Sequence, residues 1–271
     1  VQSVATRLVV DRERERIAFQ AADYADIEAT LDAGAEADPP TFSARLTHVG
    51  SHRIATGRDF GASGRLTGHS LLHLGLEAAE GLAAALQQGT YAVGSVESKS
   101  YTRRPYAPFR TTTLQQEAGR KLGFSAQRTM SVAQELYERG FITYMRTDST
   151  TLSESAVNAA RAQAAQLYGS DHVSEVARRY DRKVKNAQEA HEAIRPAGES
   201  IRTPEQVARE LDADERSVYE LIWMRTSACQ MADARARRLT LRLQALSTAD
   251  EQVVFRASGK TYEFLGFRRA Y

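Results

Sequence analysis

The order of two hydrophobic periodicities along the chain restricts its fold more than any other feature of the sequence. Short apolar and polar alternations broken by glycines occupy residues 42–64 and 91–104, and alternation returns from Leu239 to the end. Between them, residues 113–232 carry the three- and four-residue apolar spacing of amphipathic helices. Strands with a helical block inserted between them predict an α+β chain, in which one β-rich domain is built from two separated segments.

Capping sequences divide the helical block. Thr113 predicts the start of a helix that ends at Gly123, and Ser125 predicts the start of a second helix that ends at Gly140. These two helices form a predicted helix-turn-helix, and the alternating FITYMR after them predicts a strand. Further helix starts are predicted at Thr151, Thr203 and Asp212. An additional helix is expected at residues 68–86.

Composition excludes several classes of protein. No apolar run approaches the ~20 residues that cross a bilayer, and the N-terminus lacks the regions of a signal peptide. We therefore expect a cytoplasmic protein with no membrane partner. The single cysteine, Cys229, cannot form an internal disulfide, and its apolar neighbours predict a packing role.

Charge does not by itself indicate a nucleic-acid-binding protein, because the formal net charge is only +2. Any such surface must be local. Arginines and lysines gather in three places, each of which is more often a solvated face than a binding patch. The three groups are Arg103, Arg104 and Arg110; residues 178–185; and Arg235, Arg237, Arg238 and Arg242.

The segment GFITYMRTDS, residues 140–149, carries the most suggestive chemistry. On an extended backbone, Tyr144, Arg146 and Asp148 would share one face. A phenolic oxygen can attack a phosphodiester, and a neighbouring guanidinium can stabilise the charge that accumulates on phosphoryl oxygens. An aryl phosphate ester is easily displaced by a hydroxyl, so the reaction can be reversed, and the absence of a G-x-x-x-x-G-K-[ST] sequence agrees with a step that needs no ATP. The alternative is that Tyr144 packs beside Phe141 and Ile142.

Four stretches resemble a known family. GFITYMRTDST resembles the active-site sequence of type IA DNA topoisomerases of the bacterial topoisomerase I class, and residues 105–140 resemble the helices before it. AHEAIRP, residues 190–196, and VQSVATRLVVDRERER, residues 1–16, resemble two further family motifs. The composition around KNAQEAHEAIRPAGE is similar to actinobacterial members. The matches occur in the expected order and cover most of the chain.

The resemblance implies roles for individual residues. Tyr144 would become joined to a 5′ phosphate of a cleaved strand, and Arg146 would position or stabilise that phosphate. His191 matches a family histidine that assists DNA binding and cleavage, although a lone histidine is more often structural. Val1 and Gln2 match the end of a DNA-contacting stretch, with an ordinary helix start as the alternative. The usual form of this stretch in the family is S-A-G-R-V-Q, of which Val1 and Gln2 match the last two residues.

Arg195 leaves two possibilities open, because it could contact phosphate or pair with Glu192. We weight the two equally and include Arg195 among the expected DNA-binding residues.

No metal site is expected in this chain. The resemblance implies Mg²⁺, held by a D-x-D motif in a separate N-terminal domain (the Toprim domain) that is not visible here. Asp212 and Asp214 spell D-x-D, but their position favours helix capping. The pairs His48 with His52 and His69 with His73 lack a third ligand. We therefore expect this piece to carry the nucleophile but to cleave DNA poorly unless the missing domain is supplied as a partner.

The fold implied by the resemblance is a multidomain fragment of an arch or toroid. Residues 1–34 would be a helical remnant of the hinge or DNA-gate domain, and residues 107–235 a helical domain with the tyrosine. Residues 35–106 and 236–271 would form the β-rich arch, with pivots near 105–108 and 231–236. The implied activity is strand passage through a transient break in single-stranded or negatively supercoiled DNA, by a monomer associated with the nucleoid.

Two alternatives stay open. The first is a non-catalytic helix-turn-helix module that binds duplex DNA through base edges, in which Tyr144 only packs. The second lies within the same enzyme class, as a topoisomerase III or reverse gyrase core.

Overall fold

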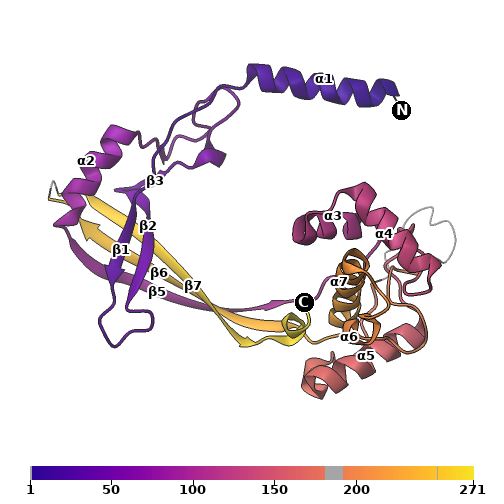
Figure 1. Cartoon of the computed structure of the whole chain (residues 1–271). Coiled ribbons are helices and arrows are strands. Elements are labelled where there is room, and N and C mark those ends of the chain that lie inside the picture. Colours follow the sequence, from indigo (N-terminus) through magenta and orange to yellow (C-terminus); the bar gives the residue numbers. More distant parts are fainter. Residues whose placement is uncertain (1, 181–191, 249) are drawn as a thin grey trace. The chain divides into compact units, whose positions relative to one another are not determined.

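The computed structural model describes residues 2–180, 192–248 and 250–271, and its elements are labelled in Figure 1. Contacts within the chain define two compact units. The first comprises Val1–Lys99 with Arg238–Lys260, and the second comprises Ser100–Arg237 with Thr261–Tyr271. Strands and helices are both present, which confirms the predicted α+β class. Three long strands carry residues of both units, and the expected domain limits stay a prediction.

Most strands belong wholly or largely to the first unit, which we call the β-rich unit. Its elements are α1 (Gln2–Ala18), β1 (Glu28–Asp32), β2 (Thr41–Val49), β3 (His52–Ile54), β4 (Leu71–Leu72) and α2 (Leu76–Gln87). The long strands are β5 (Thr90–Arg103), β6 (Ala234–Leu246) and β7 (Gln252–Phe264). The sheet has the order β4-β3-β2-β7-β6-β5, and β1 pairs antiparallel with β2.

One face of this sheet forms a hydrophobic core with helix α2. Leu46 of β2, Leu243 of β6 and Phe255 of β7 are buried there. Leu82 and Leu86 of α2 belong to the same cluster. Side chains alternate between the two faces of a strand, so the residues next to these lie on the opposite, exposed face.

The helix expected from residue 68 is shorter than predicted. It begins at Leu76, because Leu71 and Leu72 form β4, which pairs in parallel with β3. His69 and His73 therefore do not lie on one helix face, and the His73 ring hydrogen bonds to the Asp23 carbonyl oxygen at 2.6 Å. This geometry removes the basis for a metal site at that pair.

The second unit, which we call the helical unit, contains the expected helices. These are α3 (Thr111–Leu122), α4 (Ala126–Glu138), α5 (Glu154–Tyr168), α6 (Pro204–Val207) and α7 (Ala213–Cys229). Gly123 ends α3 with a left-handed φ of 70°, and the Ser125 side chain caps α4 by accepting from the Arg128 amide at 3.1 Å. Both signals were predicted correctly.

Two helix starts were predicted wrongly. The N-cap of α3 is Arg110, and the Thr113 hydroxyl accepts from the Arg110 amide at 3.0 Å from inside the first turn. The N-cap of α5 is Ser153 in place of Thr151. At α5 two hydroxyls lie close together in the sequence and the second one caps the helix, whereas the N-cap of α3 makes no side-chain capping bond that a sequence pattern could reveal.

The core of the helical unit joins residues from distant parts of the sequence. Phe109, Ile142 and Ile194 are all buried in one cluster with residues of α3, α4 and α7. Cys229 is fully buried at the end of α7, where burial raises its pKa to about 12, which confirms its packing role. Among the described residues, no helix has both the length and the apolar character that a membrane span requires.

Candidate active site

The segment that carries Tyr144 is not the strand that FITYMR predicted. Ile142 forms one isolated bridge with Pro196, and bends interrupt the backbone on both sides of Tyr144. The prediction was wrong because this backbone is not part of a strand ladder. Its polar groups are bound by two other segments of the helical unit, one on each side of Tyr144.

Residues 193–197 hold the part of the segment before Tyr144. The Thr143 amide donates to the Arg195 carbonyl at 2.9 Å, and the Arg195 amide donates to the Thr143 hydroxyl at 3.0 Å. That hydroxyl in turn donates to the Ala193 carbonyl at 2.7 Å. The Ala197 amide donates to the Phe141 carbonyl at 2.8 Å. The residues of the AHEAIRP motif therefore fix the backbone next to the candidate nucleophile.

Thr111, the first residue of α3, holds the part after Tyr144. Its hydroxyl donates to the Met145 carbonyl at 2.7 Å and accepts from the Thr147 amide at 2.9 Å. Its own amide donates to the Thr147 carbonyl at 3.0 Å. The backbone is thus bound to the end of a helix within three residues of Tyr144.

Exposure alternates along this segment as the sequence predicted, even though the backbone is not a strand. Met145 and Thr147 are buried, whereas Tyr144, Arg146 and Asp148 are exposed. The Tyr144 side chain is 41% exposed, and its ring meets the edge of Tyr137 with the ring centroids 5.3 Å apart. Within the part of the chain that the structure describes, Arg146 makes no hydrogen bond or ion pair. Its guanidinium is therefore available to an anionic substrate.

The Arg195 side chain makes its hydrogen bonds within the protein. Its Nε and Nη2 donate to the two carboxylate oxygens of Glu192 at 2.8 and 2.9 Å, and its Nη1 donates to the Pro196 and Gly198 carbonyls. Burial would raise the pKa of Glu192, but hydrogen bonds from Arg195 and the Ser153 amide outweigh burial and lower it. Of the two possibilities left open, pairing with Glu192 is confirmed, and a phosphate contact stays a prediction.

Three expected site residues cannot be placed. His191 and Val1 lie outside the described residues, and of Gln2 only the backbone at the start of α1 is described. Their DNA-contacting roles stay predictions. The apolar residues Val4, Leu8 and Val9 of α1 are exposed in the structure.

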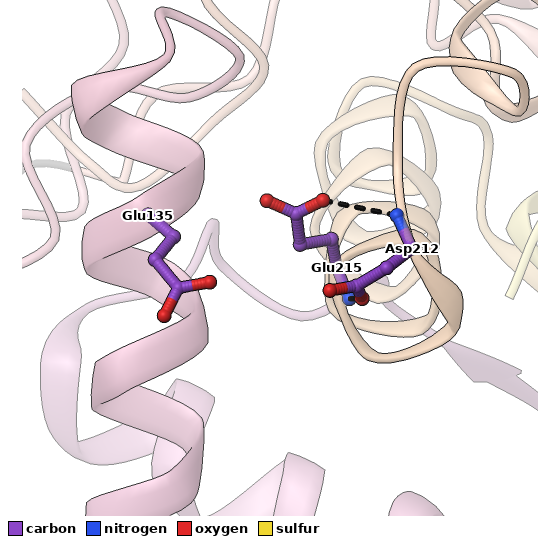
Figure 2. A group of neighbouring side chains, drawn as sticks. All are labelled: Glu135, Asp212 and Glu215. Carbon is purple, nitrogen blue, oxygen red and sulfur yellow. Dashed lines mark hydrogen bonds between the residues drawn. The ribbon is translucent and has the colours of Figure 1, made fainter.

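Three carboxylates lie close together beside α4 and α7, as Figure 2 shows for Glu135, Asp212 and Glu215. The Asp212 carboxylate accepts from the Glu215 amide at 2.8 Å, and a Glu215 oxygen accepts from the Asp212 amide at 3.0 Å. Both Glu215 oxygens also accept from Arg139. These oxygens are used in capping and ion pairing, so the group does not fit a metal ion. The capping interpretation of Asp212 is confirmed, and Asp214 pairs with Arg128.

The support that the Thr111 hydroxyl gives to the backbone after Tyr144 can be tested directly. We expect Thr111→Val to lower the free energy of unfolding by about 1–3 kcal/mol, because the substitution leaves buried polar groups of Met145 and Thr147 without this partner. Thr111→Ser keeps the hydroxyl and is expected to lose much less. Urea unfolding of both variants measures the difference, and equal stabilities would contradict a structural role for the hydroxyl.

Comparison with known proteins then decides the family. A family model described as DNA topoisomerase matches residues 1–271. The chain belongs to this DNA topoisomerase family. The resemblance to type IA topoisomerases found in the sequence is thereby confirmed.

Relatives of this topoisomerase chain include bacterial proteins named DNA topoisomerase 1. It is 60% identical to DNA topoisomerase 1 of Mycobacterium leprae and 57% identical to that of Streptomyces coelicolor, in each case over the whole chain. It covers 29% of each of these relatives, and so spans about three tenths of their length. A full-length topoisomerase I structure from Thermotoga maritima matches 97% of the chain with a TM-score of 0.69 at 29% identity, and 38% of that protein is covered. The expected actinobacterial likeness is confirmed.

Proposed function

We propose that Tyr144 is the nucleophile with which a type IA topoisomerase cuts one DNA strand. The observation that carries this proposal is the exposed Tyr144 ring on a backbone segment held from both sides. Two residues away lies Arg146, which has no hydrogen bond or ion pair to any residue that the structure describes. A tyrosine that served only to pack would be expected to lie against the core, as Tyr219 does with 1% of its surface exposed.

In the proposed step, one bond to phosphorus forms and one bond to phosphorus breaks. The Tyr144 Oη forms a bond to the phosphorus of a DNA phosphodiester and loses its proton, while the bond from phosphorus to the 3′ oxygen of the preceding nucleotide breaks and that oxygen gains a proton. The product is a 5′ phosphate joined to tyrosine. In the reverse step, the free 3′ hydroxyl attacks the same phosphorus and releases the tyrosine. No ATP is consumed, because one phosphate ester replaces another.

Arg146 would act on the phosphoryl oxygens during this step. Its charge is fixed at neutral pH, and a guanidinium presents several donors in a planar arrangement that matches a phosphate. Negative charge accumulates on the non-bridging oxygens as phosphorus becomes five-coordinate, so a positioned cation lowers the barrier. Arg195 would contribute indirectly, since its backbone holds Thr143 while its side chain pairs with Glu192.

We do not assign the Mg²⁺ of the proposed reaction to a site within this chain. The carboxylate group formed by Glu135, Asp212 and Glu215 does not fit the ion, so no step is assigned to a metal held by these residues. We propose that the remainder of a longer protein supplies the Mg²⁺ site, and that the whole enzyme relaxes negatively supercoiled DNA by passing a strand through the break.

The rival function, a helix-turn-helix that reads duplex DNA, requires Tyr144 to be a packing residue. The 41% exposure of its side chain disfavours that role. The two functions differ in their ligands, because base-edge contacts confer sequence preference on duplex DNA, whereas strand cleavage needs a single strand.

The test is to locate the covalent bond. A chimera in which this chain replaces the matching segment of the Mycobacterium leprae enzyme supplies the rest of the protein, given their 60% identity. It would be incubated with Mg²⁺ and a short single-stranded oligonucleotide whose 5′-side fragment, which carries the free 3′ hydroxyl, dissociates on cleavage and so traps the adduct. Peptide mapping by mass spectrometry is expected to find the nucleotide on the peptide containing Tyr144. An adduct on any other residue would refute the assignment.

A further inference from the structure

The exposed face of the sheet in the β-rich unit is strongly basic. Five cations lie on it, which we call the basic face: Arg45 of β2, Arg238 and Arg242 of β6, and Arg256 and Lys260 of β7. The strand neighbours of Arg45, Arg242 and Arg256 are Leu46, Leu243 and Phe255, which are buried in the core on the opposite face, and Arg238 and Lys260 line one groove with Arg45 and Arg256. An antiparallel sheet with one solvated face normally mixes polar residues there, so a face of cations calls for a physical reason.

A groove runs across this face. It has a volume of about 550 Å³ and is lined by Arg45, Arg238, Arg256, Lys260, Thr47 and Ser258. The pairing of β2 with β7 shifts register between Leu46 and His48, so that Thr47 lies at a β-bulge. A bulge bends its strand and increases the local twist, and this one lies at the groove.

The positive charge of the basic face is only partly balanced. Arg45 and Arg256 are directly paired in the register of β2 and β7, an arrangement that like charges make unfavourable. Arg45 has acidic neighbours in Asp26 and Glu28, at 3.4 and 3.9 Å. Arg256 has no hydrogen bond or ion pair to any residue that the structure describes.

One more carboxylate lies within reach of the basic face. A hydrogen bond from Lys99 lowers the pKa of Glu97, and the charges of Arg242 and Arg256 lower it further. Since Glu97 is already bonded to Lys99 at 2.6 Å, it cannot neutralise both arginines. Arg242 and Arg256, neither of which has an ion pair to a described residue, therefore keep their positive charge on the basic face.

The spacing of the cations suits a polymer better than a small anion. Arg238 and Arg242 lie four residues apart on β6, and Arg256 and Lys260 lie four residues apart on the adjacent β7. At ~3.3 Å per residue, each pair spans about 13 Å along its strand, and neighbouring strands lie ~4.8 Å apart. Two rows of this length would meet several consecutive phosphates of an extended backbone.

We propose that the basic face binds the phosphodiester backbone of DNA, as a contact separate from the Tyr144 site and independent of base sequence. The choice of DNA among polyanions rests on the proposed function. The described cations contact phosphate oxygens by charge and hydrogen bonding, and so determine where a strand lies without selecting its sequence.

The test measures how DNA affinity depends on salt. All proteins carry Tyr144→Phe, so that only binding is observed, and each is titrated with a single strand and with a duplex of the same sequence between about 50 and 200 mM salt. If Arg242 and Arg256 each neutralise one phosphate, Arg242→Gln/Arg256→Gln is expected to reduce the log-log slope by about 1.8 on duplex or about 1.4 on single-stranded DNA. The two arms show which form of DNA the face binds.

A matched control removes the same charge elsewhere in the same unit. Arg58 and Arg65 are exposed and make no hydrogen bond or ion pair by side chain with the described residues, so Arg58→Gln/Arg65→Gln is expected to leave the slope nearly unchanged. Equal losses in both double variants would mean that only net charge matters, and unchanged slopes on both forms of DNA would mean that the face does not bind it; either result overturns the proposal. A wrong Tyr144 assignment would instead appear as a misplaced adduct with normal binding.

Discussion

Tyr144→Phe is expected to reduce the covalent protein–DNA adduct below detection in the chimera described above. The substitution removes one oxygen atom and leaves the ring in place, including its edge contact with Tyr137. The backbone contacts of Thr143 and Met145 do not involve the phenol, so the fold is expected to stay intact. Denaturing gels with a labelled oligonucleotide, read beside urea unfolding curves, measure the adduct and the stability separately.

Tyr137 provides the matched control. It lies next to Tyr144, and its side chain is similarly exposed at 42%. We expect Tyr137→Phe to form the adduct at close to the parent rate. Persistence of the adduct in Tyr144→Phe, or its loss only in Tyr137→Phe, would show that the wrong phenol has been assigned.

Arg146→Ala is expected to lower the rate of strand cleavage by about 10²–10³, the usual effect of removing one group that stabilises transition-state charge. Single-turnover cleavage at saturating DNA isolates the chemical step from binding. Arg146→Lys keeps the charge but loses the planar donor arrangement, so it is expected to recover only part of the rate.

Arg209 serves as the control for this prediction, because it is exposed and makes no hydrogen bond or ion pair with the described part of the chain. Arg209→Ala is expected to leave the cleavage rate unchanged. An Arg146→Ala variant that binds DNA more weakly but cleaves bound DNA at the parent rate would assign Arg146 to binding and not to transition-state stabilisation.

Features determined by a few neighbouring residues could be predicted from the sequence. Gly123 and Ser125 mark the turn between α3 and α4, and Thr203 and Asp212 mark the starts of α6 and α7. The three capping signals arise from the bonding of one side chain to the backbone within a single helical turn, and the Gly123 signal arises from a left-handed conformation that glycine adopts without strain. The alternating exposure around Tyr144 was predicted for the same reason, since it follows from local backbone geometry.

The support of the Tyr144 segment could not be predicted. The Thr111 hydroxyl reaches Met145 across 34 positions in the sequence, and the Arg195 amide reaches Thr143 across 52. Neither threonine belongs to a pattern that distinguishes it from the other hydroxyls nearby, such as those of residues 112 and 113. The same contacts replace the ladder that would have made FITYMR a strand.

The groups that align Tyr144 are backbone amides, carbonyls and two threonine hydroxyls, none of which carries a net charge. Dissolved ions weaken attraction between exposed charges but have little effect on buried neutral hydrogen bonds. Raising the ionic strength should therefore lower the affinity for the DNA strand but leave the position of the Tyr144 backbone unchanged. The backbone around Tyr144 is then expected to keep the same hydrogen bonds at high and at low salt.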